Sequence, residues 1–452
     1  MGPSFRPAGD PTSLGDDLHA RLRALFPLCR SITGEGLRQT LRNVAEDLPL
    51  RIHEVPSGMP VLDWTVPDEW TIREAWIETV DGRRLVDFAR NNLHVVGYSR
   101  AVDRLVSRSE LRRHVHTLPA QPALVPYRTG YHADDWGFCL ADRLWSTMTD
   151  DLYRVRIDST CAPGSLSYGE FSVPGQTSEE VLLSIHCCHP SLANDNLSGL
   201  VVALEAGRRA LARQARGERR RRGLRILFLP ATIGSITWLA RNPDASARVV
   251  AGLVLACLGD PGGFHYKRSR RGAAQVDRVV ARVLPDLGHP LVELPFTPMG
   301  YDERQYGSPG FDLPVGCLMR SPNGTFPEYH TSADDPDFVR PACLAESAEV
   351  LWAVLEALDA ERHPLRVDGR GEPQLGRRGL YAAIGGRHGE GGTSQAALLW
   401  LLNLADGAHD LAAIAERAGL PFAQIRAAAD IAAAAGLLRD RDLALPHEEL
   451  VR

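Results

Sequence analysis

The chain has 452 residues, of which 44% are hydrophobic and 24% are charged, a balance typical of a globular protein with two or three domains. Its 51 basic and 56 acidic residues give a net charge of −5, which favours neither nucleic acid nor an anionic membrane as a partner. No segment approaches the roughly 18 apolar residues that span a bilayer, and the N-terminal segment lacks the apolar core of a signal peptide.

The first third of the chain predicts helices followed by a β-rich insertion. Between residues 15 and 47, leucine and valine recur at helical spacing on both sides of the segment SITGEG. Residues 51–130 instead alternate short β-like runs with turn signals such as PSG, VPD and DGR. We therefore expect an inserted β-rich subdomain at 51–130, with residues 1–50 belonging to a domain that resumes at 131.

From about residue 150 the pattern becomes α/β. The run VLLSI at 181–185 is continuously apolar, as expected for a strand that is buried on both faces, and a helix is predicted from about Leu197. Further strands are predicted at LRILFLP, VVAGLVLACLG and LPVGCLM. Strands that alternate with helices predict a mostly parallel sheet flanked by helices, over 1–50 and 131–365, with ligands at the carboxyl ends of the strands.

Residues 366–452 are rich in alanine and leucine and read as helix, turn, helix, turn, helix, which predicts a winged-helix-like domain. The segment in the place of a recognition helix, PFAQIRAAADIAAAAG, has one arginine and no lysine. Binding to phosphates needs several cations. We therefore expect this domain to act as a lid or in a homo-oligomer, with no nucleic-acid or membrane partner.

The segment HCCHPSLANDNLSG, residues 186–199, carries the strongest chemical signal. His186 follows the strand VLLSI, and Asp195 lies in the turn before the next helix. Asp260 and His330 follow two later strands, so all four side chains are expected at one edge of the sheet. Imidazole and carboxylate together suit zinc. Asp260 is the weaker candidate, because Asp-Pro-Gly is also an ordinary turn.

The neighbours of His186 leave alternatives open. His189 could be a ligand in place of His186, or it could contact the substrate or support a ligand. Cys187 and Cys188 could bind zinc as thiolates, but adjacent cysteines point apart on an extended chain. The eight cysteines of the chain are scattered and form no CxxC pair, which predicts reduced thiols in a cytoplasmic protein.

Several long motifs resemble one family. They are LFPLCRSITGEG (25–36), LDWTVPDEW (62–70), NLHVVGYS (92–99), HCCHPSLANDNLSG, SRRG (269–272), DERQYGSPGFDLPVG (302–316) and PEYHTSADDPDF (327–338). With these motifs the chain resembles the aminopeptidase-like proteins related to the M28 zinc exopeptidases, known as DUF4910 or DUF2172 proteins. The resemblance implies a zinc-peptidase-like α/β domain, an inserted β-rich domain and a C-terminal winged helix.

The resemblance also implies a ligand set for one or two zinc ions. The His-x-Asp motif of M28 enzymes becomes His186-Cys187-Cys188 here, so its supporting aspartate is missing and His189 is a possible substitute. Asp195 matches the aspartate that bridges two ions, and Asp260 matches a later acidic ligand loosely. His330 matches the last histidine.

One departure from the family concerns the general base. Relatives resemble Pro-Glu-Thr-Ile-Gly-Ser after the strand LRILFLP, whereas this chain has alanine at the second position, Ala231. M28 enzymes place their general-base glutamate in this region, and alanine cannot accept a proton. Either the glutamate was removed by engineering, or the chain is a natural variant with altered hydrolysis.

The sequence therefore predicts a zinc-dependent aminopeptidase-like hydrolase that acts on a small peptide or amide. By position, Asp302, Glu303, Arg304 and Tyr329 are candidates for holding the amine or carboxylate of the substrate, although DERQ could equally be an exposed, capped turn. The second hypothesis is a catalytically inactive pseudoenzyme that keeps zinc. The third is a regulatory or nucleic-acid-binding protein that uses the winged helix.

Overall fold

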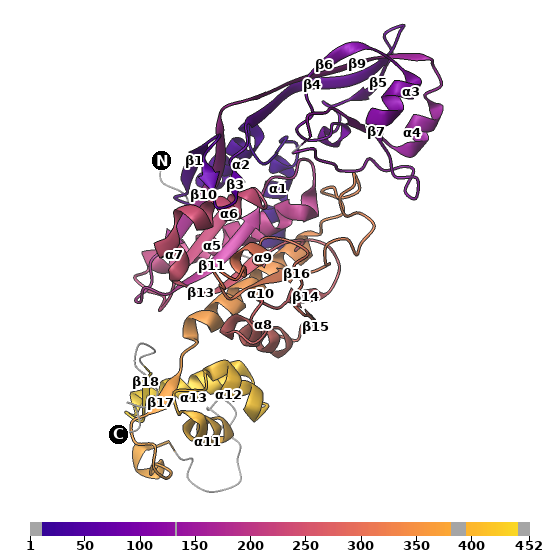
Figure 1. The fold of residues 1–452 in the computed structure, drawn as a ribbon. Coiled ribbons are helices and arrows are strands. Elements are labelled where there is room, and N and C mark those ends of the chain that lie inside the picture. Colours follow the sequence, from indigo (N-terminus) through magenta and orange to yellow (C-terminus); the bar gives the residue numbers. More distant parts are fainter. Residues whose placement is uncertain (1–10, 132, 381–394, 442–452) are drawn as a thin grey trace.

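The computed structural model describes residues 11–131, 133–380 and 395–441, which form three bodies in a row (Figure 1). An α/β domain lies in the middle, the β-rich insertion projects from one end, and the C-terminal helical domain lies at the other end. Among the described residues, no helix has both the length and the apolar character that a membrane span requires.

The central domain is built on one eight-stranded sheet. Its strands, in spatial order, are β1 (Arg51–Pro56), β10 (Ser165–Val173), β12 (Gly223–Leu229), β11 (Glu180–His186), β13 (Val249–Leu255), β16 (Val315–Met319), β14 (Phe264–Lys267) and β15 (Leu291–Leu294). The four middle strands, from β12 to β16, run parallel, and the strands beside them, β10 and β14, run antiparallel. The expected mostly parallel sheet is therefore confirmed in its centre.

Helices cover both faces of this sheet. One face packs against α1 (Pro11–Leu25), α2 (Glu35–Ala45), α5 (Gly199–Ala215), α8 (Gln275–Asp286) and α10 (Pro341–Ala360). The other face carries α6 (Ile233–Arg241), α7 (Pro243–Ala247) and α9 (Glu303–Tyr306). Successive side chains of β11 enter the two cores alternately, since Leu183 and Ile185 join the first and Leu182 joins the second.

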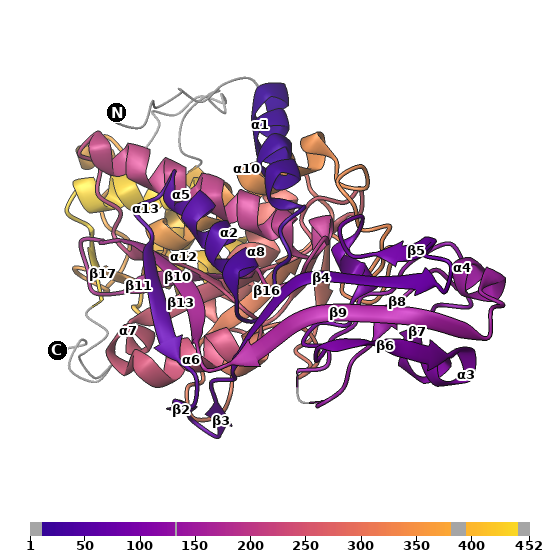
Figure 2. The ribbon, with the colours of Figure 1, turned by 90° about the horizontal axis from the view of Figure 1, so that it is seen from above.

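The insertion is a four-stranded antiparallel sheet with small accessory elements. Its strand order is β5 (Arg84–Asp87), β4 (Glu69–Thr79), β9 (Leu152–Ala162) and β6 (Val102–Ser107). Accessory elements are β2 (Pro60–Val61), β3 (Trp64–Thr65), α3 (Arg108–Leu111), β7 (Val115–His116), β8 (Phe138–Cys139) and α4 (Asp142–Thr147). The long strands β4 and β9 leave the central domain together and carry the insertion outward (Figure 2).

The boundaries of the insertion differ from the expected range 51–130. Strand β1 pairs with β10 in the central sheet, so residues 51–56 belong to the α/β domain. Strand β9 pairs with β4 along its length, so the insertion extends to Ala162. The reason is visible in β9, where buried and exposed side chains alternate as in a half-exposed antiparallel strand rather than a parallel one.

The C-terminal domain consists of β17 (Pro364–Arg366), α11 (Gln395–Leu404), α12 (Leu411–Ala418), α13 (Phe422–Ala434) and β18 (Leu438–Asp440). Strands β17 and β18 pair beside the three helices, so the described part of this domain begins slightly before residue 366. It is attached to the central domain at α8, where Arg278 forms an ion pair with Asp410 and the backbone N–H of Phe422 donates to Asp286. Residues 381–394 and 442–452 of the expected domain lie outside the described residues.

Candidate metal centre at the carboxyl edge of the sheet

Asp195 lies at the centre of the candidate site, fully buried in the turn η3 (Ala193–Ser198) before α5. Its Oδ1 is 2.8 Å from Nε2 of His186, and its Oδ2 is 2.9 Å from Nε2 of His330. Nδ1 of His189 lies 3.4 Å from Oδ2 of Asp195 and 3.1 Å from its backbone carbonyl oxygen. The structure thus brings together four of the five side chains that were expected as ligands.

Secondary structure and buried hydrogen bonds fix these side chains. His186 is the last residue of β11 and pairs in register with Leu229, the last residue of β12. The Asp334 carboxylate accepts hydrogen bonds from the backbone N–H groups of Ala193, Asn194 and Asp195, at 3.1, 2.5 and 3.0 Å. The turn that presents Asp195 is therefore held by one buried carboxylate from the segment after His330.

The electrostatics of the cluster leave one carboxylate and at least one neutral imidazole. Burial by itself would raise the pKa of Asp195, but His189 and His186 hold that pKa well below its ordinary value. Burial lowers the pKa of His186, so its imidazole is neutral near pH 7 and keeps a lone pair. Burial lowers the pKa of His189, but the negative charge of Asp195 and the hydrogen bonds to it raise that pKa by more, so the net shift is upward. An anionic carboxylate beside imidazoles is a donor set that zinc prefers.

The arrangement passes a geometric test for one metal ion. Ligand atoms of His186, His189 and Asp195 all lie within 4.8 Å of one another, which is compatible with ligand bonds of about 2.0–2.2 Å to a shared ion. The side chain of His330 is 33% exposed, whereas that of Asp195 is fully buried. The cluster can therefore be approached from the side of His330, as a catalytic metal site requires.

Asp260 lies outside this cluster and has other hydrogen bonds. Its Oδ1 accepts from the N–H of Gly262 at 2.8 Å and from the hydroxyl of Ser321 at 2.6 Å. Its Oδ2 accepts from Nδ2 of Asn194 at 2.9 Å, so Asp260 holds the residue next to Asp195. The hydrogen bond to Gly262 is the one that an Asp-Pro-Gly turn makes, the alternative that the sequence left open.

Ala231 lies beside the histidines, directly after β12. Leu229 pairs with His186, and Sγ of Cys188 lies 3.9 Å from the carbonyl oxygen of Ala231. Burial raises the pKa of the Cys188 thiol to about 12, so this group is protonated at neutral pH in the metal-free protein. The edge of the sheet at residue 231 therefore carries a methyl group and a neutral thiol.

The four expected substrate contacts fall into different environments. Asp302 and Glu303 are fully buried, and Asp302 makes no side-chain capping bond to α9, so the alternative of an exposed, capped turn is wrong. Glu303 forms an ion pair with Lys267, and Nη1 of Arg304 donates to a backbone carbonyl at 3.3 Å. The ring of Tyr329 stacks on His330 with centroids 4.0 Å apart.

Sequence reasoning missed several neighbours of the cluster. The guanidinium of Arg30 is buried, and its Nε donates to the carbonyl oxygen of His189 at 2.8 Å. Tyr127 comes from the insertion, and its ring centroid lies 5.0 Å from those of both His189 and His330. Tyr301 stacks on His186 at 5.0 Å. The one available signal was for Arg30, which lies in the motif LFPLCRSITGEG; the tyrosines had none.

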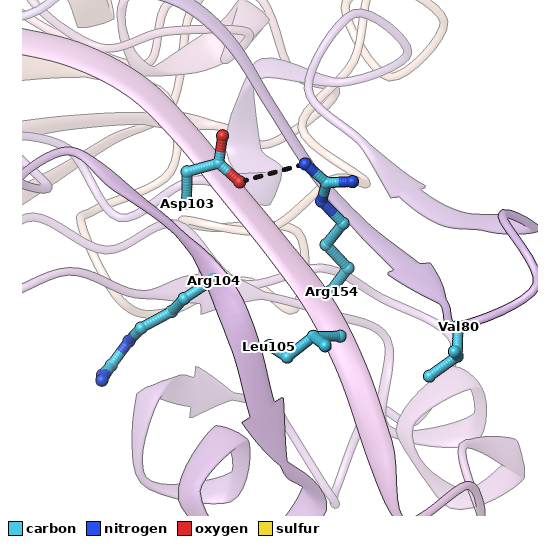
Figure 3. Close-up of a pocket in the computed structure, with 5 residues that line it drawn as sticks. All are labelled: Val80, Asp103, Arg104, Leu105 and Arg154. Carbon is cyan, nitrogen blue, oxygen red and sulfur yellow. Dashed lines mark ion pairs between the residues drawn. The ribbon is translucent and has the colours of Figure 1, made fainter.

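A separate surface hollow lies on the inserted sheet (Figure 3). It is lined by Val80, Asp103, Arg104, Leu105 and Arg154. The carboxylate of Asp103 and the guanidinium of Arg154 are 3.5 Å apart and neutralise each other. This hollow contains none of the expected site residues, so its charges form a solvated surface rather than a second candidate site.

Comparison with known proteins separates the C-terminal domain from the rest of the chain. The family described as "Domain of unknown function (DUF4910)" matches residues 19–361, and a winged helix-turn-helix family matches residues 362–440. A curated relative from Clostridium acetobutylicum is 42% identical over 416 residues, covering 92% of this chain and 94% of the relative. Its name provisionally describes a polysaccharide biosynthesis protein with an aminopeptidase-like domain.

Two solved structures extend the comparison. A crystal structure from Clostridium acetobutylicum, provisionally described as a peptidase, has a TM-score of 0.86 and 39% identity, covering 95% of this chain and 97% of its own. A zinc aminopeptidase from Bacillus subtilis has a TM-score of 0.55 and 11% identity, covering 78% of this chain and 96% of its own. The second likeness shows the fold of the central domain.

Proposed function

The chain belongs to the aminopeptidase-like DUF4910 family, and from that premise we propose that it is a zinc-dependent hydrolase of a small peptide or amide. The observation that carries the proposal is the cluster of His186, His189 and Asp195, whose ligand atoms lie within 4.8 Å of one another. His186 and His330 lie on different oxygens of Asp195, an arrangement compatible with one ion or with a carboxylate that bridges two.

Separate residues would bind the metal, support its ligands and contact the substrate. His186, His189, Asp195 and His330 would hold the metal, with Asp260 supporting them through Asn194. When bound, zinc would polarise the scissile carbonyl and lower the pKa of the attacking water. Tyr329, which stacks on the partly exposed His330, would contact the substrate; this stacking supports that role.

Residue 231 lies at the position where the resemblance to M28 enzymes implies a general base, so its identity bears on the rate of hydrolysis. A positioned general base typically contributes about 10²–10⁴-fold in rate. Because Ala231 cannot accept a proton, hydrolysis by this chain would be slow unless another group acts as the base, whether the alanine is engineered or natural. The same residue favours a second candidate function, that of a zinc-binding pseudoenzyme.

The substitution Ala231→Glu tests the proposed function. Wild-type and variant protein, each loaded with zinc, would be assayed on a panel of aminoacyl amides and dipeptides with and without a chelator. We expect chelator-sensitive hydrolysis by the wild type and a higher rate for the variant, by up to about 10²–10⁴-fold if the wild type has no other base. Zinc binding without hydrolysis by either protein would favour the pseudoenzyme, and failure of both to bind zinc would contradict both functions.

A further inference from the structure

Asp302 is a buried carboxyl group that lies beside the start of α6. Its Oδ1 is 2.9 Å from the hydroxyl of Ser235, which lies in the first turn of that helix. Ser235 follows Ala231 by four residues, and Ala231 directly precedes Thr232, the N-cap of α6. The residue before Asp302 is Tyr301, and its ring stacks on the ring of His186. Asp302 therefore contacts the helix that follows residue 231, and the residue before it contacts the histidine cluster.

The hydrogen bonds around Ser235 accommodate both protonation states of Asp302. The Ser235 hydroxyl lies 2.8 Å from the carbonyl oxygen of Thr232 and 2.9 Å from Asp302, but it has a single proton to donate. When Ser235 donates to Thr232, a protonated Asp302 can donate to the hydroxyl in turn. When Ser235 donates to Asp302, the carboxylate is ionised. The same contacts thus serve a carboxyl group that gains and loses a proton.

Asp302 also lacks the partners that usually occupy a buried carboxylate. Its Oδ2 is buried and has no hydrogen-bond partner among the described residues. The adjacent Glu303 forms an ion pair with Lys267, whereas no ion pair with Asp302 is found in the described part of the chain. A purely structural carboxylate is expected to be fully paired. Oδ2 of Asp302 is instead a hydrogen-bond acceptor that no described residue uses.

The surroundings place the titration of Asp302 near neutrality. Burial raises its pKa to about 7, and the hydrogen bond from Ser235 opposes that shift. A general base works best when its pKa lies near the working pH. Other titratable groups that face Asp302 are Glu303, Arg304 and Tyr306 on its own element, Cys187, Cys188 and His189 after β11, and Cys317 on β16.

We propose that Asp302 is the proton acceptor of this hydrolase, in a chain whose residue 231 has no carboxylate. The proposal rests on the proposed function and replaces the role in substrate binding that the position of Asp302 suggested. The carboxylate accepts one proton from the attacking water while the water oxygen bonds to the carbonyl carbon. When the C–N bond breaks, Asp302 returns that proton to the leaving nitrogen, so the enzyme ends the cycle unchanged.

The pH dependence of kcat/KM tests this assignment. Because the base must be ionised, the wild-type rate should rise with pH through about 7. Asp302→Asn should lower the rate about 10²-fold or more and abolish that rising limb. Ser235→Ala removes a donor that favours the ionised form, so its limb should move to higher pH. Ala231→Glu supplies a base with an ordinary pKa of about 4.3, so its limb should move to lower pH.

The matched control is Asp103→Asn, the same substitution on the remote inserted sheet, which should leave rate and limb unchanged. If the wild type hydrolyses substrate and Asp302→Asn keeps its rate and its limb, the role of Asp302 is refuted and the proposed function stands. If neither the wild type nor Ala231→Glu hydrolyses any substrate, both are refuted. If Asp302→Asn fails to fold, the pH dependence of kcat/KM for Ser235→Ala decides. A rising limb at the same pH as in the wild type would overturn the assignment.

Discussion

The carboxyl edge of the central sheet and the outer face of the inserted sheet are both rich in charged side chains, but they use them differently. On the inserted sheet, Asp103 pairs with both Arg154 and Arg156, and all three side chains are at least one-third exposed. At the sheet edge, Asp195 and His186 are buried and have ligand atoms that one metal ion could share. Exposed charge alone therefore does not mark a candidate site, whereas buried groups whose ligand atoms one metal ion could share do so.

The insertion also contacts the residues of the site directly. The backbone N–H of Tyr127, a residue of the insertion, donates to the carbonyl oxygen of His330 at 2.8 Å. The ring of Tyr127 packs beside both His189 and His330. The insertion thus contributes to the site through a loop at its base rather than through its charged outer face.

The largest effect is expected from Asp334→Ala at the sheet edge. The substitution leaves the buried backbone N–H groups of residues 194 and 195 without their acceptor, whereas that of Ala193 keeps the backbone carbonyl oxygen of residue 334 at 3.0 Å. At about 1–3 kcal/mol for each unpaired group, the free energy of unfolding should fall by roughly 2 kcal/mol or more. Urea denaturation of the metal-free protein measures this loss. Asp337→Ala, which removes an exposed carboxylate from the same segment, should cost less than about 1 kcal/mol; equal losses would contradict the account.

An intermediate effect is expected from Asn194→Ala. Asn194 links the turn of Asp195 to Asp260 and accepts a hydrogen bond from the N–H of Gly259 at 2.9 Å. Loss of a residue that supports a ligand typically lowers metal affinity about 10–100-fold. Competition with a chromophoric chelator measures the zinc affinity. An unchanged affinity would show that the turn of Asp195 does not need this support.

The smallest effect is expected from Arg154→Ala on the inserted sheet. An exposed ion pair contributes at most about 1 kcal/mol, so thermal unfolding should change little. Zinc affinity and the rate of hydrolysis should stay at wild-type values, because the hollow of Figure 3 holds none of the expected ligands. A tenfold loss of zinc affinity in this variant would remove the distinction between the two regions.

Local pattern was sufficient to predict the strand that carries His186 and the turn that carries Asp195. The continuous apolar run before His186 indicates a strand buried on both faces, and the structure ends β11 at that residue. The segment NDN before a helical pattern likewise indicates the turn, and α5 begins at Gly199. Both inferences need only neighbours in sequence.

The neighbours of the cluster could not be predicted, because distant contacts select them. Arg30 contacts His189 across 159 positions of the chain, and the motif that contains Arg30 does not indicate which residue it contacts. Asp260 and Asp195 both follow strands of the same sheet. The carboxylate of Asp260, however, accepts hydrogen bonds from the N–H of Gly262 within its own turn and from the side chain of Asn194. Strand order places residues at one edge, but tertiary hydrogen bonds decide which side chains meet.

Zinc stoichiometry of Asp195→Asn and Asp260→Asn decides whether the metal binds at the cluster around Asp195. The two variants make the same nearly isosteric change to two buried aspartates at one sheet edge. After zinc loading and removal of free metal, elemental analysis should find no zinc in Asp195→Asn and the wild-type amount in Asp260→Asn. Zinc retained by Asp195→Asn and lost from Asp260→Asn would contradict the claim that the metal binds at the cluster around Asp195.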